Sequence, residues 1–310
     1  MNIENVLRET LADMAGEERP PHPDRFLRPG RERPARRPGR RPARSGLALA
    51  AAAAVTVLAL GSTLAVRTLS DPDPRTSHTA VQPAPATVRV TVRPAMRLSD
   101  TLRRLATATG KPVGAFTEAA KDGTALGLPP YAEGGMEGFA YPGTYDIPTT
   151  ATPADILASM VARFTRTAEQ TGVAASPDPR DVVIIASLVE AESPAESDMP
   201  KVARVIRNRL DRGMSLQLDS TVLYGLGRYG VAASTRDLAS RSPYNTYRRR
   251  GLPPGPIANP GEAALRAALN PAPGPWLHFV AVSPKTLKFA ASDAEFLELV
   301  RERERNGRAR

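Results

Sequence analysis

Two glutamates close a strongly apolar helical pattern, the run DVVIIASLVEAES at residues 181–193. In a helix, Leu188 and Ile185 precede Glu192 by four and seven residues, so the carboxyl group of Glu192 continues an apolar stripe. A carboxyl group among apolar side chains loses hydration, and its pKa rises toward the range in which it can donate a proton at neutral pH. Glu190 lies on a less apolar side of the same helix. The alternative is that both glutamates belong to a solvated helix end, where most glutamates are found.

The composition excludes several classes of chemistry. The chain has 310 residues, 41% of them hydrophobic, which is compatible with one or two folded domains. It contains no cysteine, so disulfides, thiolate metal sites and a cysteine nucleophile are excluded. We expect no metal and no cofactor. The net charge of +10 could indicate a nucleic-acid partner, but no aromatic residues alternate with the densest block of arginines, and we expect no nucleic acid.

An uncharged, alanine-rich segment at residues 46–66 predicts a single membrane-spanning helix. Its 21 residues are long enough, at ~1.5 Å per residue, to cross a hydrocarbon core of about 30 Å. Nine arginines and one acidic residue lie between Arg25 and Arg44, whereas the charges on the far side nearly balance, so the N-terminus is predicted to be cytoplasmic. A cleaved signal peptide is the alternative, but its charged region would be unusually long. We therefore expect a single-pass protein of the cell membrane, with an Arg-rich cytoplasmic tail at residues 1–45 and an extracytoplasmic remainder.

After this segment the pattern predicts a linker and then an α+β fold. Residues 67–87 are proline-rich and polar, as linkers are. Val88, Val90 and Val92 alternate with polar residues, which predicts a half-buried strand. Two helices follow at residues 101–109 and 113–122, and a strand followed by two short helices is the order of a LysM-like module. Further predictions are helices at 153–167, 261–269 and 292–300, a strand at 276–282, and a mobile charged tail at 301–310.

Five segments together resemble one known family. They are EGFAYPGTY (137–145), SLVEAES (187–193), VIRNRLDRGMSLQLDSTVLYGLG (205–227), SPYNTYRRRGLPPGPIANPG (242–261) and ALNPAPGPWLHFVAV (268–282). In order and spacing they resemble the MltG or YceG-like family of membrane-anchored endolytic murein transglycosylases. The resemblance implies a LysM-like subdomain with a connector at residues 88–165, followed by an α+β catalytic subdomain at residues 166–300.

The resemblance also implies an activity. A lytic transglycosylase cleaves the bond between N-acetylmuramic acid (MurNAc) and N-acetylglucosamine (GlcNAc) in peptidoglycan without water, leaving 1,6-anhydroMurNAc ends. Acting within nascent glycan strands, such an enzyme would terminate their elongation, in association with the peptidoglycan synthesis complex. One carboxyl group can act first as the acid and then as the base. By alignment with the family's VEKET-type motif, Glu192 takes this role, and Glu190 becomes a neighbour that raises the pKa of Glu192 by like-charge repulsion.

Two polar segments supply candidate substrate-binding residues. If residues 217–221 are extended, alternate polar side chains share one face, and the motif SPYNTY offers rings for stacking on sugars and short polar groups for their hydroxyls. The candidates are Gln217, Asp219, Thr221, Tyr244, Asn245, Thr246 and Tyr247. Asp219 is the candidate for stabilising positive charge on the sugar. The alternative for Asp219 is a cap on a helix that contains Thr221.

The chain departs from the family pattern in one place. Many relatives have a GGHTF-type segment after the strand FVA, where this chain reads PKTLKF at residues 284–289. His278, beside Trp276 and Phe279, is expected in the core or at its rim rather than in catalysis. Two other functions stay open: a muramidase that hydrolyses the same bond with water, and a non-catalytic, membrane-tethered scaffold that binds peptidoglycan.

Overall fold

The computed structural model describes residues 86–230 and 232–308, which lie within one compact unit, Pro83–Arg310. The predicted tail at 1–45, the predicted membrane segment at 46–66 and nearly all of the linker at 67–87 lie outside the described residues. Within the described part, no helix combines the length and the apolar character that crossing a membrane requires. The observed fold is α+β, with helices and two small sheets.

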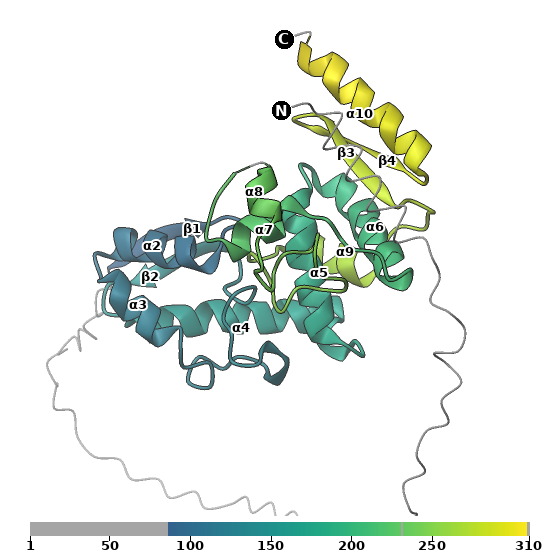
Figure 1. Cartoon of the computed structure of the whole chain (residues 1–310). Helices are drawn as coiled ribbons and strands as arrows, with labels where there is room; N and C mark the ends of the chain where they lie inside the picture. Colours follow the sequence, from purple (N-terminus) through teal and green to yellow (C-terminus); the bar gives the residue numbers. More distant parts are fainter. Residues whose placement is uncertain (1–85, 231, 309–310) are drawn as a thin grey trace, which may run out of the picture. The chain divides into compact units, whose positions relative to one another are not determined.

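The first group of elements has the order β-α-α-β (Figure 1). It comprises β1 (Thr87–Val92), α2 (Leu98–Thr109), α3 (Val113–Ala119) and β2 (Gly143–Pro148), with a short 3-10 helix, η2 (Pro130–Ala132), before β2. The strands pair antiparallel, with Val90 opposite Tyr145. The predicted strand and both helices are confirmed, although α2 begins three residues earlier and α3 ends three residues earlier than predicted. Val90 and Val92 are buried, as the alternation predicted.

Helix α4 (Pro153–Thr171) joins two hydrophobic clusters. It begins at a capping box made by Thr152 and Asp155, in which each residue satisfies a backbone N–H of the other. Met160 packs in the cluster that contains β1 and α2, whereas Phe164, one turn later, packs in the cluster that contains α5. The subdomain boundary predicted after residue 165 therefore falls inside a continuous helix.

The second group surrounds helix α5. It comprises η3 (Val173–Ala175), α5 (Pro179–Glu192), η4 (Glu196–Asp198), α6 (Met199–Asp211), α7 (Asp219–Gly225), α8 (Thr235–Leu238) and α9 (Glu262–Leu269). Helices α6, α7 and α9 pack against α5, as Figure 1 shows. Every residue from 182 to 189 is buried, so α5 is enclosed on all sides rather than along one stripe. Its side chains leave the core only at its two ends, residues 179–181 and 190–192.

The C-terminal elements differ from the prediction. They are β3 (His278–Ser283), β4 (Thr286–Ala290) and α10 (Asp293–Arg308). The strand at 276–282 is confirmed in large part, but β4 was not predicted, and the tail expected to be mobile continues α10 to Arg308. Polar contacts explain why α10 extends to Arg308. Lys288 Nζ pairs with Glu302 at 2.7 Å, and Asn306 donates to the carbonyl oxygen of Val282 at 3.1 Å. These contacts hold a helical segment that has almost no apolar residues of its own.

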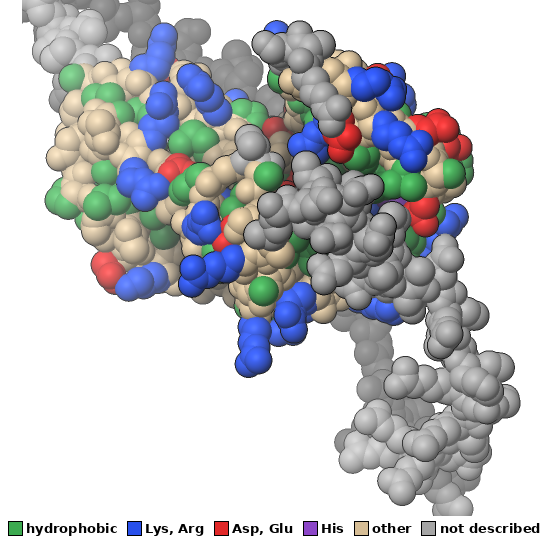
Figure 2. Space-filling view, turned by 45° about the horizontal axis from the view of Figure 1, so that its top comes forward, with side chains coloured by type: hydrophobic (Ala, Val, Ile, Leu, Met, Phe, Trp, Pro, Cys, Tyr) green, Lys and Arg blue, Asp and Glu red, His purple; other side chains and the backbone are tan. Residues whose placement is uncertain are grey.

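The charged side chains of this unit are spread over its surface. On the face shown in Figure 2, Lys and Arg side chains are interspersed with hydrophobic and acidic ones. The excess Lys and Arg side chains are therefore not concentrated in a single basic patch on this face.

Asn259 joins the two groups of elements through its side chain and its backbone. Its Oδ1 accepts from the backbone N–H groups of Gly138 and Ala140, both at 3.1 Å, and its Nδ2 donates to the carbonyl oxygen of Met96 at 3.0 Å. Its backbone carbonyl also accepts from Ala95 N at 3.1 Å. Asn259 is fully buried, so water cannot replace these partners.

We expect Asn259→Ala to lower the free energy of unfolding by roughly 2–4 kcal/mol, because it leaves the buried N–H groups of Gly138 and Ala140 without an acceptor. Urea unfolding of the purified protein measures this change. The exposed asparagine substitution Asn270→Ala serves as the control and should change stability by less than about 0.5 kcal/mol. Equal effects of the two substitutions would contradict the role of Asn259 at this junction.

Candidate functional site

Glu192 is the last residue of α5 and leaves the core at its edge. The eight preceding buried residues fix the direction in which the helix ends, and Glu192 itself is half-buried. One oxygen, Oε1, accepts a hydrogen bond from the Ser220 hydroxyl at 2.5 Å, and the backbone N–H of Ser220 also bonds to this carboxyl group. The carboxyl group is therefore oriented by the first turn of α7.

The predicted extended run at residues 217–221 is wrong. Helix α7 begins at Asp219, so Gln217, Asp219 and Thr221 do not share one face of a strand. The reason is that Gln217 N donates to Thr246 O at 3.1 Å and Leu218 N to Thr246 Oγ1 at 3.0 Å, which turns the chain into the helix. Gln217 has a φ of 53°, a left-handed conformation typical of such turns.

Asp219 lies beside the Glu192 carboxyl group. It does not cap α7: its Oδ1 accepts from the Tyr247 hydroxyl at 2.6 Å, and its Oδ2 accepts from Ala233 N at 3.1 Å. Tyr247 is half-buried, and burial together with the charges of Asp219 and Glu192 raises its pKa far above the ordinary range. Glu192, Asp219, Ser220 and Tyr247 therefore form one compact polar cluster, which we call the Glu192 cluster.

The pKa of Glu192 is raised, first by loss of hydration and then by the negative charge of Asp219, while the bonds from Ser220 oppose the shift. The pKa of Glu192 shifts in the predicted direction, but the acidic residue that contributes to the shift is not the predicted one, Glu190. Glu190 turns to the other side of α5, where its Oε2 accepts from Gly261 N at 2.9 Å. The pKa of Glu190 is itself raised by burial and by Glu196. The neighbouring carboxylate that acts on Glu192 is Asp219.

The SPYNTY loop divides into buried and accessible residues. Thr221, Asn245 and Thr246 are buried and bonded within the protein: Thr246 Oγ1 lies 2.8 Å from Thr221 Oγ1, and Asn245 Nδ2 donates to Ser240 O at 2.8 Å. Their hydrogen bonds hold this loop against α7. Half-buried Tyr244 and Tyr247 retain accessible surface, and so does Gln217.

Gly225 allows the same loop to approach the end of α7. A Cβ atom at this position would lie 2.2 Å from Ser242 Oγ and 2.9 Å from Tyr244 Cβ, which no side chain can tolerate without a shift of the loop. The close approach brings the ring of Tyr244 to 4.8 Å from that of Tyr224 on α7.

Arg209 fixes the segment that carries Gln217. This buried guanidinium donates to the carbonyl oxygens of Leu216 at 2.9 Å and Leu277 at 2.6 Å, and to Gln217 Oε1 at 3.3 Å. Its Nη2 also lies 3.1 Å from Nδ1 of His278, which is buried as predicted. Burial, and then the charge of Arg209, lower the pKa of His278 to about 4, so His278 is neutral at neutral pH.

Glu137 is a carboxyl group that the sequence analysis did not single out. Its Oε1 accepts from Leu98 N at the start of α2 (2.9 Å), and its Oε2 accepts from the Tyr224 hydroxyl (3.1 Å). Burial raises the pKa of Glu137 to about 7, against opposing contributions from these bonds and from Arg97. Tyr224 follows Ser220 by one helical turn, so Glu137 and Glu192 bond to the same side of α7. The only signal in the sequence was its place between apolar residues at the start of EGFAYPGTY.

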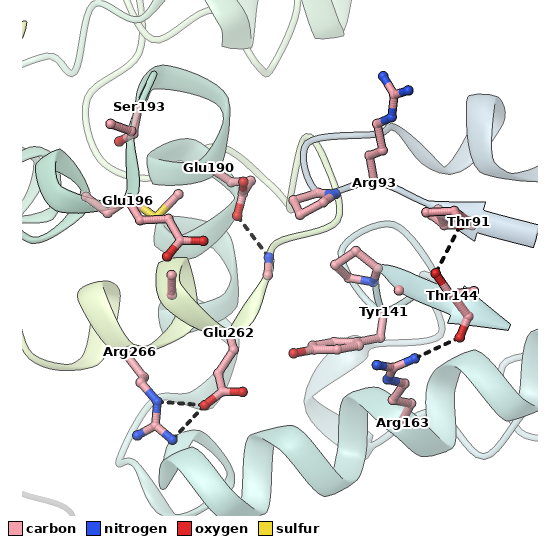
Figure 3. A pocket seen from close by; sticks show the side chains of 18 of the residues that line it. Thr91, Arg93, Tyr141, Thr144, Arg163, Glu190, Ser193, Glu196, Glu262 and Arg266 are labelled. Atoms are coloured by element: carbon pink, nitrogen blue, oxygen red, sulfur yellow. Dashed lines mark hydrogen bonds and ion pairs between the residues drawn. The ribbon is translucent and has the colours of Figure 1, made fainter. Parts of the chain in front are cut away.

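A separate pocket of about 760 Å³ lies on the Glu190 side of α5 (Figure 3). Glu190 and Ser193 line it, whereas Glu192 and the SPYNTY loop do not. The opposite wall comes from the ends of β1 and β2 and from α4. Within residues 86–230 and 232–308, no three acidic or histidine side chains come together as a candidate metal site.

Comparisons with known proteins identify relatives of this chain. The model of the YceG-like family matches residues 65–302. The endolytic murein transglycosylase of Bacillus subtilis is 37% identical over 164 residues, which cover 49% of this chain and 45% of the relative. That of Streptococcus pneumoniae is 32% identical over 154 residues, which cover 47% of this chain and 28% of the relative. The matched region thus covers less than half the length of each of these curated relatives.

A solved structure shares the fold. The crystal structure of a yceG-like protein from Listeria monocytogenes is 25% identical, superposes with a TM-score of 0.61, and covers 68% of this chain and 75% of that chain.

Asp219→Asn is expected to lower the pKa of Glu192, because it removes the neighbouring negative charge that disfavours ionisation while keeping an acceptor for Tyr247. Titration of selectively ¹³C-labelled glutamate carboxyl groups by NMR measures the shift, with Glu192→Gln identifying the resonance. Glu190→Gln serves as the matched control and should leave the pKa of Glu192 in place. The assignment is wrong if the Glu190 substitution, rather than the Asp219 substitution, moves this titration.

Glu137 should make stability depend on pH near neutrality. Its folded-state pKa of about 7 lies above the ordinary 4.5, so its contribution is fully present below pH 4.5 and is lost as pH rises toward 7. Relative to Glu137→Gln, the wild type should lose up to about 3 kcal/mol of unfolding free energy between pH 5 and 8, at about 1.4 kcal/mol per pKa unit. Urea unfolding of both proteins at each pH gives this difference. A difference that is constant with pH would show that Glu137 titrates normally.

Proposed function

The chain belongs to the YceG-like family, and from this premise we propose that it is an endolytic lytic transglycosylase of peptidoglycan. It would cleave the MurNAc-GlcNAc bond within nascent glycan strands and leave 1,6-anhydroMurNAc ends, thereby terminating their elongation. The observation that carries the proposal is the half-buried Glu192 carboxyl group, with a raised pKa, at the end of an enclosed apolar helix. The names of the curated relatives support the same activity.

Glu192 would act twice in the reaction. Protonated Glu192 donates its proton to the glycosidic oxygen as the bond from this oxygen to C1 of MurNAc breaks. The resulting carboxylate then accepts the proton of the C6 hydroxyl of MurNAc as the C6 oxygen bonds to C1. Glu192 is protonated again at the end, and no water is consumed. This use of one residue differs from the paired carboxylates of most glycoside hydrolases.

The neighbours of Glu192 would serve the same sequence of steps. Ser220 orients the carboxyl group by its hydroxyl and backbone N–H. Asp219 favours the protonated acid at the start, and its fixed negative charge would stabilise the positive charge that develops on the sugar. The accessible parts of Gln217, Tyr244 and Tyr247 would contact the sugars, whereas the buried Thr221, Asn245 and Thr246 would position the loop.

The remaining chain would place this site at the membrane. We propose that residues 46–66 form a single membrane anchor with a cytoplasmic N-terminus, and that the residues after them lie outside the cytoplasm. The β-α-α-β order of β1, α2, α3 and β2 supports a LysM-like subdomain, which would hold the glycan strand near the catalytic subdomain. Association with the peptidoglycan synthesis complex follows from action on nascent strands.

Digestion of purified glycan strands by the full-length chain tests the proposal. We expect products with anhydro ends, lighter by one water than hydrolysis products, and a loss of at least ~100-fold in rate for Glu192→Gln, in the range typical of general acid-base catalysis. Mass spectrometry identifies the ends, and far-ultraviolet circular dichroism checks the fold of the variant. Glu298→Gln, an exposed substitution on α10, is the matched control and should cleave normally.

Two results would contradict this function. Products that have gained water would indicate a muramidase. Unchanged cell-wall binding without any cleavage by the wild type would indicate a tethered scaffold.

A further inference from the structure

The pocket on the Glu190 side of α5 has walls of opposite charge. Arg93 directly follows β1 and Arg163 lies on α4, and Figure 3 places both on the side opposite Glu190 and Glu196. Glu262 and Arg266 also line the pocket, but they neutralise each other in an ion pair of 2.7 Å. The uncompensated charges are therefore positive on one wall and negative on the other.

Two hydroxyl groups of residues that line this pocket lack partners within the described part of the chain. Tyr141 is only 8% exposed, yet its hydroxyl makes no hydrogen bond with another described residue. Figure 3 shows this hydroxyl directed across the pocket toward the wall that carries the glutamates. The hydroxyl of Ser193 is buried and likewise has no partner among the described residues. The Tyr141 hydroxyl faces the pocket and is therefore available to a ligand. Buried hydroxyls normally have partners, so the unpartnered Ser193 hydroxyl marks an unsatisfied polar point in the opposite wall.

The charges are also available. Arg163 donates to Thr144 O at 3.3 Å and lies over the ring of Tyr141, but its positive charge faces no carboxylate in the described chain. Arg93 and Glu196 are exposed and, among described residues, form no hydrogen bond or ion pair through their side chains. A volume of about 760 Å³ lies within the usual range for small-ligand sites.

We propose that this pocket binds a short zwitterionic peptide, with carboxylate groups toward Arg93 and Arg163 and an ammonium group toward Glu190 and Glu196. A neutral sugar would satisfy the Tyr141 hydroxyl but would leave both charged walls unmatched. An anion alone would meet repulsion from the glutamates. Only a ligand that carries both charges complements the whole pocket.

This inference rests on the proposed function in one respect, the origin of the peptide. The glycan strands of peptidoglycan carry stem peptides with free carboxylate and amino groups. Glu190 and Ser193, which line the pocket, flank Glu192 in sequence at the end of α5. A strand whose sugars contact the Glu192 cluster would extend past the C-terminal end of α5 to place one stem peptide in the pocket, which would make the enzyme selective for strands that bear peptides.

Peptide binding can be measured without any cleavage of glycan. The full-length chain in detergent micelles is titrated with a synthetic stem tetrapeptide that has a free side-chain ammonium group, and binding is followed by calorimetry. The same titration uses the N-acetylated and amidated peptide, and chitotetraose as a neutral sugar. We expect the zwitterionic peptide to bind at least ~10-fold more tightly than either control, a difference of about 1.4 kcal/mol.

Substitutions then locate the binding. Tyr141→Phe, Arg93→Gln and Glu196→Gln should each weaken peptide binding by roughly threefold to fivefold, as expected for one hydrogen bond or one partly exposed ion pair. Arg303→Gln and Glu298→Gln, exposed substitutions on α10, are the matched controls and should bind as the wild type does. The inference is overturned if the peptide does not bind, if the pocket variants bind it equally well, or if chitotetraose binds with the same sensitivity to these substitutions.

Cleavage assays separate this inference from the proposed function. The wild type should cleave peptide-bearing strands with a higher kcat/KM than strands stripped by an amidase, and Arg93→Gln and Glu196→Gln should reduce this ratio. Equal cleavage of both strands would overturn the pocket's role and leave the transglycosylase intact. Peptide binding without cleavage of either strand would overturn the proposed function instead.

Discussion

The enclosure of α5 is the constraint on which the rest of this structure depends. A helix that is buried on every side from residue 182 to residue 189 can admit charged side chains only where it leaves the core. Glu192 occupies that point, half out of water, and the low local hydration favours its protonated form. The bonds from Ser220 reduce this shift but fix the direction of the carboxyl group. The two effects together give a carboxyl group whose pKa is raised and whose direction is fixed.

The elements around α5 explain why the site requires the whole folded unit. Asn259 ties the segment before α9 to the start of the first group, and Glu137 ties the start of α2 to Tyr224 on α7. Both residues connect the two hydrophobic clusters, and α4 contributes side chains to both clusters. The position of α7 beside Glu192 is therefore coupled to the packing of the first group. A substitution of Asn259 or Glu137 can therefore alter the Glu192 cluster without changing a residue of that cluster.

The sequence predicted the features that depend on local pattern. The apolar periodicity before Glu192 indicated a buried helix end, and the valine alternation indicated β1. Features set by contacts distant in sequence were not predictable. The start of α7 at Asp219 depends on Thr246, nearly thirty residues away. The same turn brings Asp219, rather than the predicted Glu190, close enough to raise the pKa of Glu192. The burial of Glu137 was not predicted because it arises from contacts with α2 and α7. The helical end of α10 was not predicted because it depends on polar contacts of Lys288 and Asn306.

The pH dependence of glycan cleavage tests the central claim most directly. If Glu192 must begin the reaction protonated, kcat/KM falls as pH rises through its raised pKa, and Asp219→Asn moves that fall to lower pH. If the reaction required the ionised carboxylate at the start, kcat/KM would instead rise with pH over the same range. A rise, or a fall that Asp219→Asn does not move, would contradict the account of Glu192 as a desolvated general acid.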